Sequence, residues 1–114
     1  MIAQKYRFHG HASIKYLLHN GKQVRNKLTS IKYVDNNRRH YSRVAIIVSK
    51  KVAKHAVDRN RIRRRMYEII REQIPAFKRT VDLAVFVYND QVATAPAADL
   101  SKEINSSLKK AELI

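Results

Sequence analysis

The stretch RVAIIVSKKVAKHAVDRNRIRRRMYEIIRE, residues 43–72, decides most of the fold. Residues 43–49 form a nearly continuous apolar run of strand length. Beyond them the chain has no glycine or proline before Pro75, which predicts a helix of roughly 20 residues. Four apolar side chains share one arc of this helix: Ile62, Met66, Ile69 and Ile70. The stretch therefore predicts a buried strand followed by an amphipathic helix that packs by this arc.

The opposite side of the predicted helix is strongly cationic. Segment 50–71 holds nine basic residues against two acidic ones, a net charge of +7. The basic residues are Lys50, Lys51, Lys54, Arg59, Arg61, Arg63, Arg64, Arg65 and Arg71, and the acidic ones are Asp58 and Glu68. Arginine predominates, and its planar guanidinium matches two phosphate oxygens at once. Because the acids that would relieve i,i+4 repulsion are largely missing, phosphate groups are the expected neutralising partner.

The charge of the whole chain agrees with that of the helix. The 114 residues include 24 Lys and Arg against 9 Asp and Glu, a formal net charge of +15. Such a field attracts polyanions, so nucleic acid is the expected partner. Apolar residues make up 45% of the chain and fall in clusters, which predicts one folded domain over 1–114, with an irregular arm at 1–12.

No apolar run approaches the ~20 residues of a membrane-spanning helix, so no membrane partner is expected. Cysteine is absent, which removes disulfides and thiolate chemistry together. This composition fits a cytoplasmic protein.

Two helices and two strands complete the predicted fold. The first helix begins at Ser13, whose hydroxyl can cap it, and ends at Gly21. The last helix begins with Asp99 as its cap and repeats an apolar residue every fourth position. Alternating side chains predict a strand at 28–34, and the sequence DLAVFVY predicts another at 82–88.

The order of these elements indicates the fold class. Turn-prone residues at 35–39 separate strand 28–34 from strand 43–49, which predicts a hairpin. The resulting order is α-β-β-α-β-α, with no repeat and no internal linker. This order favours an α+β fold: a single-domain α/β sandwich in which helices pack on one small sheet.

The residue types that catalyse reactions or bind metals are scattered. The five histidines form no HExxH pattern and no cluster with carboxylates. The nine carboxylates show no DxD or ExxE spacing that would hold two magnesium ions. No catalytic residue, no protein-bound metal and no protein-bound cofactor is therefore expected.

Two aromatic residues differ in their expected roles. Tyr67 falls between the apolar arc and the cationic side of the helix, where its ring could stack on an unpaired base. Phe86 lies in a predicted strand, where packing in the core is expected instead.

The stretch 43–72 resembles the bacterial ribonuclease P protein. In that family a strand ends in a VSKK-like turn and leads into a helix with an Arg-Asn-Arg motif followed by further basic residues. Val48-Ser49-Lys50-Lys51 and Arg59-Asn60-Arg61 match these elements in order and spacing, and Arg63 and Arg64 follow. The order of helices and strands agrees over nearly the whole chain.

The resemblance implies a fold like domain 2 of a ribosomal protein, with a left-handed βαβ crossover in place of the usual right-handed one. It also implies a role as protein subunit of the ribonuclease P ribonucleoprotein, an endoribonuclease that removes the 5′ leader of precursor tRNA. The implied partners are the catalytic RNA subunit and precursor tRNA, with no DNA. Mg²⁺ is expected through the RNA subunit, which holds the catalytic metals in this family.

The resemblance and the charge together assign site residues. The expected RNA-binding residues are Lys50, Lys51, Arg59, Asn60, Arg61, Arg63, Arg64, Arg65 and Arg71. A cleft between sheet and helix is implied for the single-stranded leader, lined by Ile14, Leu18, Ser30, Lys32, Asn60, Arg63 and Tyr67.

Two other classes of function remain open at this point. A structural RNA-binding protein, such as a basic ribosomal component, would explain the charge equally well. A self-sufficient metal-dependent nuclease ranks last because the carboxylates are sparse and scattered.

Overall fold

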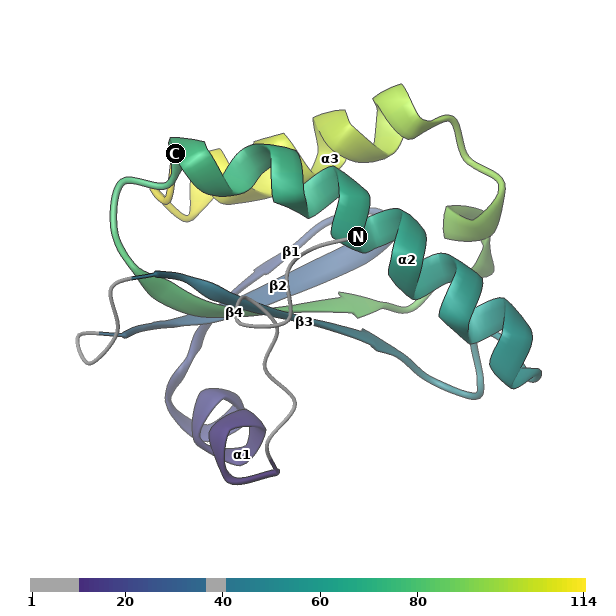
Figure 1. Ribbon diagram of the computed structural model, residues 1–114, viewed down its shortest axis with the longest axis horizontal. Helices are drawn as coiled ribbons and strands as arrows, with labels where there is room; N and C mark the ends of the chain where they lie inside the picture. Colours follow the sequence, from purple (N-terminus) through teal and green to yellow (C-terminus); the bar gives the residue numbers. More distant parts are fainter. Residues whose placement is uncertain (1–10, 37–40) are drawn as a thin grey trace.

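A computed structural model describes residues 11–36 and 41–114, with side chains from Ile14 onward (Figure 1). Three helices and four strands make up most of this part of the chain. In chain order the elements are α1 (His11–Asn20), β1 (Lys22–Arg25), β2 (Thr29–Asp35), β3 (Arg43–Val48), α2 (Ala56–Gln73), the 3-10 turn η2 (Ile74–Ala76), β4 (Val81–Val87), the 3-10 turn η3 (Asp90–Ala93) and α3 (Ala97–Lys110). The predicted α+β sandwich is confirmed, with one extra strand, β1.

The strands form one mixed sheet in the order β1-β2-β4-β3. β4 is the central strand: it pairs antiparallel with β2 and parallel with β3. The predicted hairpin between residues 28–34 and 43–49 is therefore wrong, because β4 lies between these two strands. β4 is buried along most of its length on both faces, as suits an interior strand. β1 escaped prediction because it is short and polar, with only Val24 half-buried in it.

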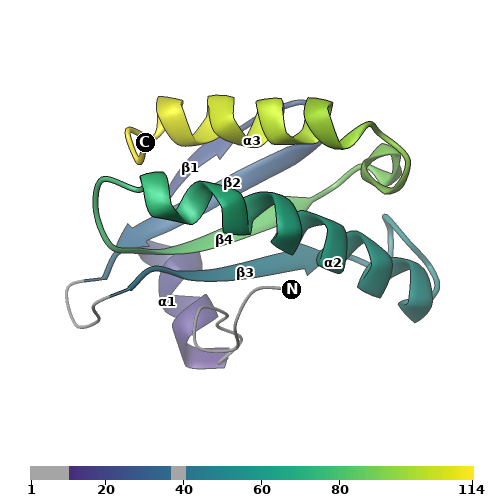
Figure 2. The same ribbon diagram turned by 45° about the horizontal axis from the view of Figure 1, so that its top comes forward.

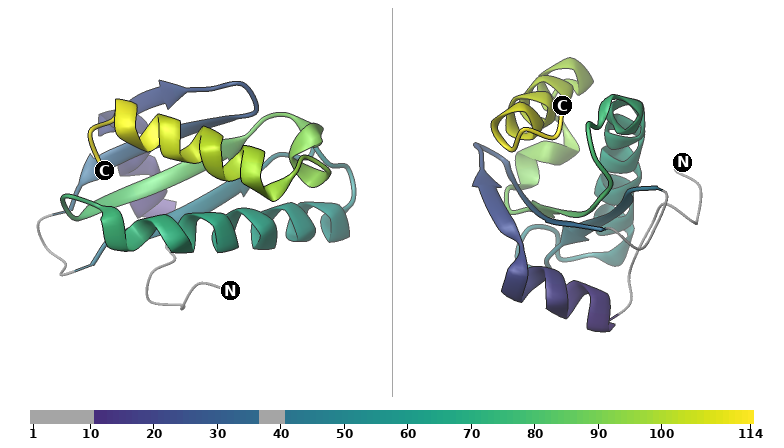
Figure 3. Two further views of the ribbon diagram at one scale, coloured as in Figure 1. Left: turned by 90° about the horizontal axis from the view of Figure 1, so that it is seen from above. Right: turned by 90° about the vertical axis from the view of Figure 1, so that its left-hand side faces the viewer.

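Helices cover both faces of the sheet (Figure 1). α2 and α3 lie side by side on one face (Figure 3), and α1 lies on the other. The alternation of β2 serves both layers: Ile31 and Tyr33 join the large core under α2 and α3, while Ser30 and Lys32 point to the side of α1. On that side a smaller core forms around Leu17 of α1.

The connection from β3 through α2 to β4 is left-handed. Figure 2 views the sheet from the side that α2 covers, and both strands run from left to right with β4 above β3. A right-handed crossover, the usual form, would place β4 below β3. The left-handed crossover that the family resemblance implies is therefore confirmed.

Helix boundaries differ from the sequence prediction where caps were inferred. α1 begins at His11, so the predicted start at Ser13 is wrong and Ser13 is the third residue of the helix. α3 begins at Ala97 with Pro96 at the cap, so Asp99 is not the capping residue. Asp99 lies in the first turn, where its negative charge interacts favourably with the helix dipole. The predicted irregular arm at 1–12 falls mostly outside the described residues, and its last two residues are helical.

Gly21 ends α1 at a point of close approach. Its N–H donates to the Leu17 carbonyl oxygen over 2.8 Å. A Cβ at this position would lie 2.6 Å from that oxygen and 3.0 Å from Cγ of Lys32 on β2. The connection from helix to sheet therefore requires a residue without a side chain.

We expect Gly21→Ala to lower the free energy of unfolding by about 1–3 kcal/mol, because the backbone must shift to admit the methyl group. Urea denaturation measures this change. His19→Ala, at an exposed position of the same helix turn, is the matched control and should stay near wild type. Equal stability of both variants would show that the connection relaxes without cost.

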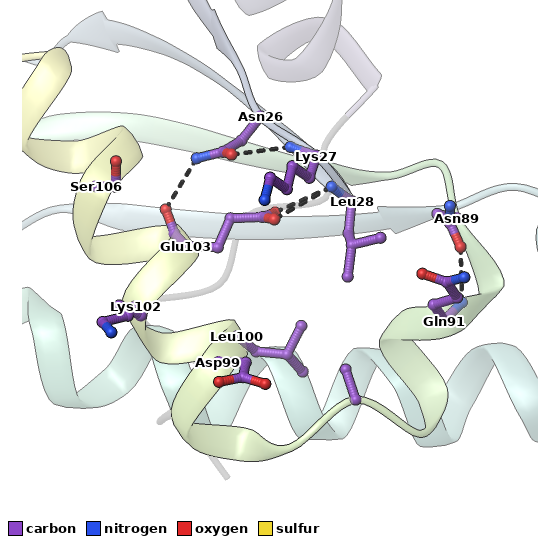
Figure 4. A pocket seen from close by; sticks show the side chains of 11 residues that line it. Asn26, Lys27, Leu28, Asn89, Gln91, Asp99, Leu100, Lys102, Glu103 and Ser106 are labelled. Carbon is purple, nitrogen blue, oxygen red and sulfur yellow. Dashed lines mark hydrogen bonds between the residues drawn. The ribbon is translucent and has the colours of Figure 1, made fainter.

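Glu103 ties α3 to the turn between β1 and β2 (Figure 4). Its carboxylate accepts from the Leu28 N–H at 3.2 and 3.3 Å and from the Thr29 hydroxyl at 2.6 Å. Asn26 in the same turn donates to the Glu103 carbonyl oxygen and to the Ser107 hydroxyl. One of the few acidic side chains of the protein is therefore engaged in holding the fold.

Candidate nucleic-acid interface

The outer face of α2 carries the free arginines of the candidate site. The apolar arc predicted from the sequence, including Ile62 and Met66, is buried against the sheet. Arg61 and Arg64 lie on the opposite side, exposed, and neither has an ion pair or hydrogen bond within the described part of the chain. Unpaired guanidinium groups on a rigid helix present their donors to a ligand without first breaking an internal contact. This pair is therefore the centre of the candidate site.

The turn before α2 adds lysines to this site. Lys50 and Lys51 are exposed in the turn that follows β3, where the Ser49 carbonyl oxygen accepts from Val52 N–H at 3.1 Å. The predicted VSKK turn is therefore present. Next to it, at the start of α2, a hollow of about 330 Å³ is lined by Arg61, the carboxylates Asp58 and Asp90, and five further residues.

Arg65 has a structural role that the sequence did not reveal. Its Nη1 donates to the carbonyl oxygens of Val92 and Ala93 at 2.9 and 3.0 Å, and its Nη2 donates to that of Ala95. The guanidinium thereby clamps α2 to the η3 segment between β4 and α3. Three of its five N–H donors are engaged by backbone carbonyls, so Arg65 offers less to RNA than the sequence predicted.

Arg59 is likewise engaged within the protein. Its Nη1 donates to the carbonyl oxygens of Ala53 and Lys54, both at 2.9 Å, and so fixes the segment that leads into α2. The side chain is half-buried. The Arg-Asn-Arg motif therefore contains one arginine that shapes the start of the helix and one, Arg61, that has no partner among the described residues.

The remaining predicted residues of α2 make contacts along the helix surface. Arg63 donates through Nη2 to the Asn60 side-chain oxygen, which orients the two side chains together. Arg71 pairs with Glu68 at 2.9 Å, and both side chains are about half exposed. Exposed pairs of this kind contribute little to the stability of the fold. The main effect of this pair is that the Glu68 carboxylate offsets the positive charge of Arg71.

Tyr67 does not take the position predicted for a base-stacking residue. It is buried, with 9% of its surface exposed, and belongs to the core under α2 and α3. A ring enclosed by the core offers no free face to a base. Because Tyr67 lies near the edge of the apolar arc, the sequence was compatible both with an exposed ring and with a ring buried in the core.

The residues predicted to line one cleft divide between the two faces of the sheet. Ser30 and Lys32 face the side of the sheet that α1 covers, and Lys32 Nζ donates to the carbonyl oxygen of Leu18 on α1 at 2.6 Å. The other members, Asn60, Arg63 and Tyr67, belong to α2, which covers the opposite face. A single cleft containing all seven residues is therefore wrong.

A continuous row of side chains crosses the sheet on the α1 side. The register aligns Arg25 with Ser30, Ser30 with Phe86, and Phe86 with Ile47 across all four strands. Phe86 and Ile47 are half-buried, and Ser30 is buried, its hydroxyl accepting from Gln23 at 2.9 Å. We call these four residues, with Tyr88 beyond the end of β4, the α1-side row.

Tyr88 adds an accessible aromatic ring to this row. The residue is 37% exposed, its hydroxyl donates to the Asn26 carbonyl oxygen, and the Arg25 guanidinium lies 5.0 Å from the ring centroid. Aromatic rings flanked by cations are the combination that single-stranded nucleic acids require. The sequence placed Tyr88 in a strand but gave no sign of its pairing with Arg25, since the two are 63 positions apart.

Arg43, at the far end of the same sheet face, is held internally. It donates to both oxygens of Asp82, at 2.9 Å from Nε and 2.7 Å from Nη2, and this hydrogen bonding raises the pKa of Arg43. Asn36 donates to the same carboxylate at 2.8 Å. These hydrogen bonds connect β3 to β4, and they engage the Arg43 guanidinium within the protein.

Comparison with known proteins gives this geometry a context. The chain matches the family model described as Ribonuclease P over residues 2–112. The chain belongs to the ribonuclease P protein family. It is 38% identical over 94 residues to the ribonuclease P protein component of Clostridioides difficile, covering 82% of this chain and 80% of the relative. Identity to the component of a Pseudanabaena species is 33% over 95 residues, with the same two coverages.

Solved structures of the family share the fold. The ribonuclease P protein of Staphylococcus aureus superposes with a TM-score of 0.82 at 23% identity, covering 95% of this chain and 96% of that one. That of Thermotoga maritima gives 0.80 at 20% identity, covering 91% and 96%.

Family membership fixes the coarse function. The chain is a protein subunit of ribonuclease P, a component of a ribonucleoprotein endoribonuclease that processes tRNA, and membership implies association with ribonuclease P RNA. Among the described residues, no three His, Asp or Glu side chains gather where they could hold a metal ion, and no helix is long and apolar enough to cross a membrane.

Proposed function

We propose that this ribonuclease P protein binds the catalytic RNA subunit through the outer face of α2 and holds the 5′ leader of precursor tRNA on the α1-side row. In this way it aids the endonucleolytic removal of the leader that gives the mature tRNA 5′ end. The observation that carries the first part is the pair Arg61 and Arg64, exposed and unpaired within the described residues. A protein of net charge +15 also offsets the phosphate repulsion between a substrate RNA and an RNA catalyst.

The two surfaces suit different kinds of RNA. The α2 face offers guanidinium and ammonium groups, without an exposed aromatic ring on the helix, and matches the phosphates of a folded RNA. The α1-side row offers Phe86 and Tyr88 beside Arg25, which suits unpaired bases with their backbone. Precursor tRNA, and no DNA, is the proposed substrate because a single-stranded leader joined to a folded RNA engages both surfaces.

The chemistry of cleavage is assigned to the RNA subunit. The described carboxylates are dispersed, and several serve the fold: Asp82 holds Arg43 and Glu103 holds the β1–β2 turn. This donor set does not fit a resident metal pair, so Mg²⁺ is expected through the RNA. The protein positions the leader and screens charge.

Addition of the protein to a cognate catalytic RNA at low Mg²⁺ is expected to restore cleavage of precursor tRNA. Equal affinity of the assembled enzyme for mature and leader-bearing tRNA would instead support a structural RNA-binding role. Cleavage by the protein without RNA would support a nuclease site on the chain and overturn the proposal.

For the leader surface we expect Tyr88→Ala to weaken binding of leader-bearing tRNA about tenfold, because one stacked base contributes about 1–3 kcal/mol. Binding of mature tRNA should not change. Tyr16→Ala, which removes a tyrosine that is 58% exposed on α1, is the matched control. A loss of the same size with mature tRNA would place Tyr88 outside the leader path.

A further inference from the structure

A second cationic surface lies on α3. Lys102 and Lys109 stand two turns apart on the side of the helix opposite the buried Leu100, Ile104 and Leu108. Lys27 from the β1–β2 turn and Lys110 flank them. All four lysines are exposed, and none has an ion pair or hydrogen bond from its side chain within the described residues. We call these four residues the lysine face.

Two neighbouring hollows in the surface connect the four lysines. A hollow of about 730 Å³ between the β1–β2 turn, η3 and α3 is lined by Lys27 and Lys102, among other residues (Figure 4). A second hollow of about 520 Å³ continues along α3 and is lined by Lys102, Asn105, Ser106, Lys109 and Lys110. Lys102 lines both hollows, so the surface extends from the turn to the end of the helix.

Acidic neighbours do not neutralise this surface. Four positions before and after Lys102 stand Ala98 and Ser106, and four positions before Lys109 stands Asn105, so the stabilising i,i+4 ion pairs are missing. Glu103 lines the first hollow, but its carboxylate already accepts hydrogen bonds from the Leu28 N–H and the Thr29 hydroxyl. Asp99, the other carboxylate that lines the first hollow, stands three positions before Lys102 but makes no ion pair with it within the described part of the chain, and no described carboxylate lines the second hollow.

The helix dipole explains only part of this pattern. Lys109 and Lys110 lie in the last turn of α3, where positive charge is favourable. Lys102 lies in the middle of the helix and Lys27 on a different element, where the dipole gives no advantage. The alignment of all four along two connected hollows therefore suggests an external anion.

The chemistry of the face indicates which anion. The second hollow carries ammonium groups, one amide and one hydroxyl, and the first adds the side-chain amides of Asn26, Asn89 and Gln91; among the described residues, neither an aromatic ring nor an arginine lines either hollow. Such side chains contact phosphates and 2′-hydroxyl groups, which a double-stranded RNA displays across its shallow minor groove. Single-stranded RNA would gain little here, since its bases would find no stacking partner.

We propose that the lysine face binds the phosphate backbone of a double-stranded RNA segment, separate from the RNA that the outer face of α2 binds. α2 and α3 lie side by side on the sheet and each presents its outer side to solvent (Figure 3). The protein is then a bridge between two RNA segments, with an arginine contact on α2 and a lysine contact on α3.

Stoichiometry with a short duplex tests the bridge. The probe is a blunt RNA duplex of about 12 base pairs, shorter than the ~16 base pairs that a double-stranded RNA-binding domain spans. By native mass spectrometry at low salt, the wild-type protein should bind two duplexes. Lys102→Ala with Lys109→Ala should bind one, and Arg61→Ala with Arg64→Ala should also bind one.

The control for charge alone is Lys15→Ala with Lys78→Ala, which removes two exposed lysines elsewhere and should still bind two duplexes. Circular dichroism verifies that each variant is folded, as expected from exposed sites and the high helix propensity of alanine. A single duplex on the wild type, or two on the Lys102 and Lys109 variant, would overturn the proposal. The assay contains no catalytic RNA and no leader, so its failure leaves the cleavage and leader tests to decide the proposed function separately.

Discussion

Arg65→Ala is expected to lower the free energy of unfolding by about 2 kcal/mol while leaving the salt dependence of RNA binding unchanged. Three carbonyl oxygens, those of Val92, Ala93 and Ala95, lose their donor together. A hydrogen bond to a charged group contributes about 1.5–3 kcal/mol, and partial exposure of Arg65 reduces the total below the sum. Equilibrium urea unfolding measures the loss.

Arg64→Ala is the control on the same helix. Its side chain is exposed and has no partner within the described residues, so stability should change by less than about 0.5 kcal/mol. Arg65→Lys tests the geometry further, because one ammonium group cannot span three carbonyls as the guanidinium does. Wild-type stability of Arg65→Ala would show that the η3 segment holds its position without the clamp.

Arg61→Ala combined with Arg64→Ala is expected to weaken binding to the catalytic RNA by about 10- to 100-fold at physiological salt. Each substitution should remove about one contact between an arginine and a phosphate. The slope of log affinity against log salt concentration should therefore become shallower by about two units. Filter binding or fluorescence anisotropy over a salt series measures both quantities.

Arg71→Ala is the control for this experiment. It removes the same side chain from the same helix, but Glu68 already neutralises Arg71 at 2.9 Å. Its slope should change by clearly less than one unit. An unchanged slope in the Arg61 and Arg64 double variant would mean that RNA approaches another face of the protein.

The sequence predicted the local elements well because their signals are local. The 18 residues of α2 carry no glycine or proline and show a clear apolar arc, so both the helix and its buried side followed from periodicity. Strand pairing was not predictable in this way. The alternation of residues 28–34 shows which side chains share a face, but it does not reveal that β4 lies between β2 and β3.

The sequence predicted the candidate site as a charged surface. Only the tertiary contacts show which of its arginines are exposed to a ligand and which are bonded within the protein. Charge density located α2, yet Arg61 and Arg65 are alike in sequence. The partners of Arg65 lie 27 to 30 positions further along the chain, so nothing near it in the sequence marks it as a clamp. Tyr67 stood at the border of the apolar arc, and the packing of α2 beside α3 decided its burial.

The position of β4 at the centre of the sheet has a kinetic consequence. Its partners in β2 are between 46 residues away (Asp35 with Val81) and 58 residues away (Thr29 with Val87). β3 also depends on β4, because β4 is its only partner among the described strands. Early in folding only the β1–β2 hairpin and the helices can form from neighbouring residues. High contact order of this kind slows folding toward the millisecond-to-second range, and until the last strand docks, two apolar strands stay open to wrong partners.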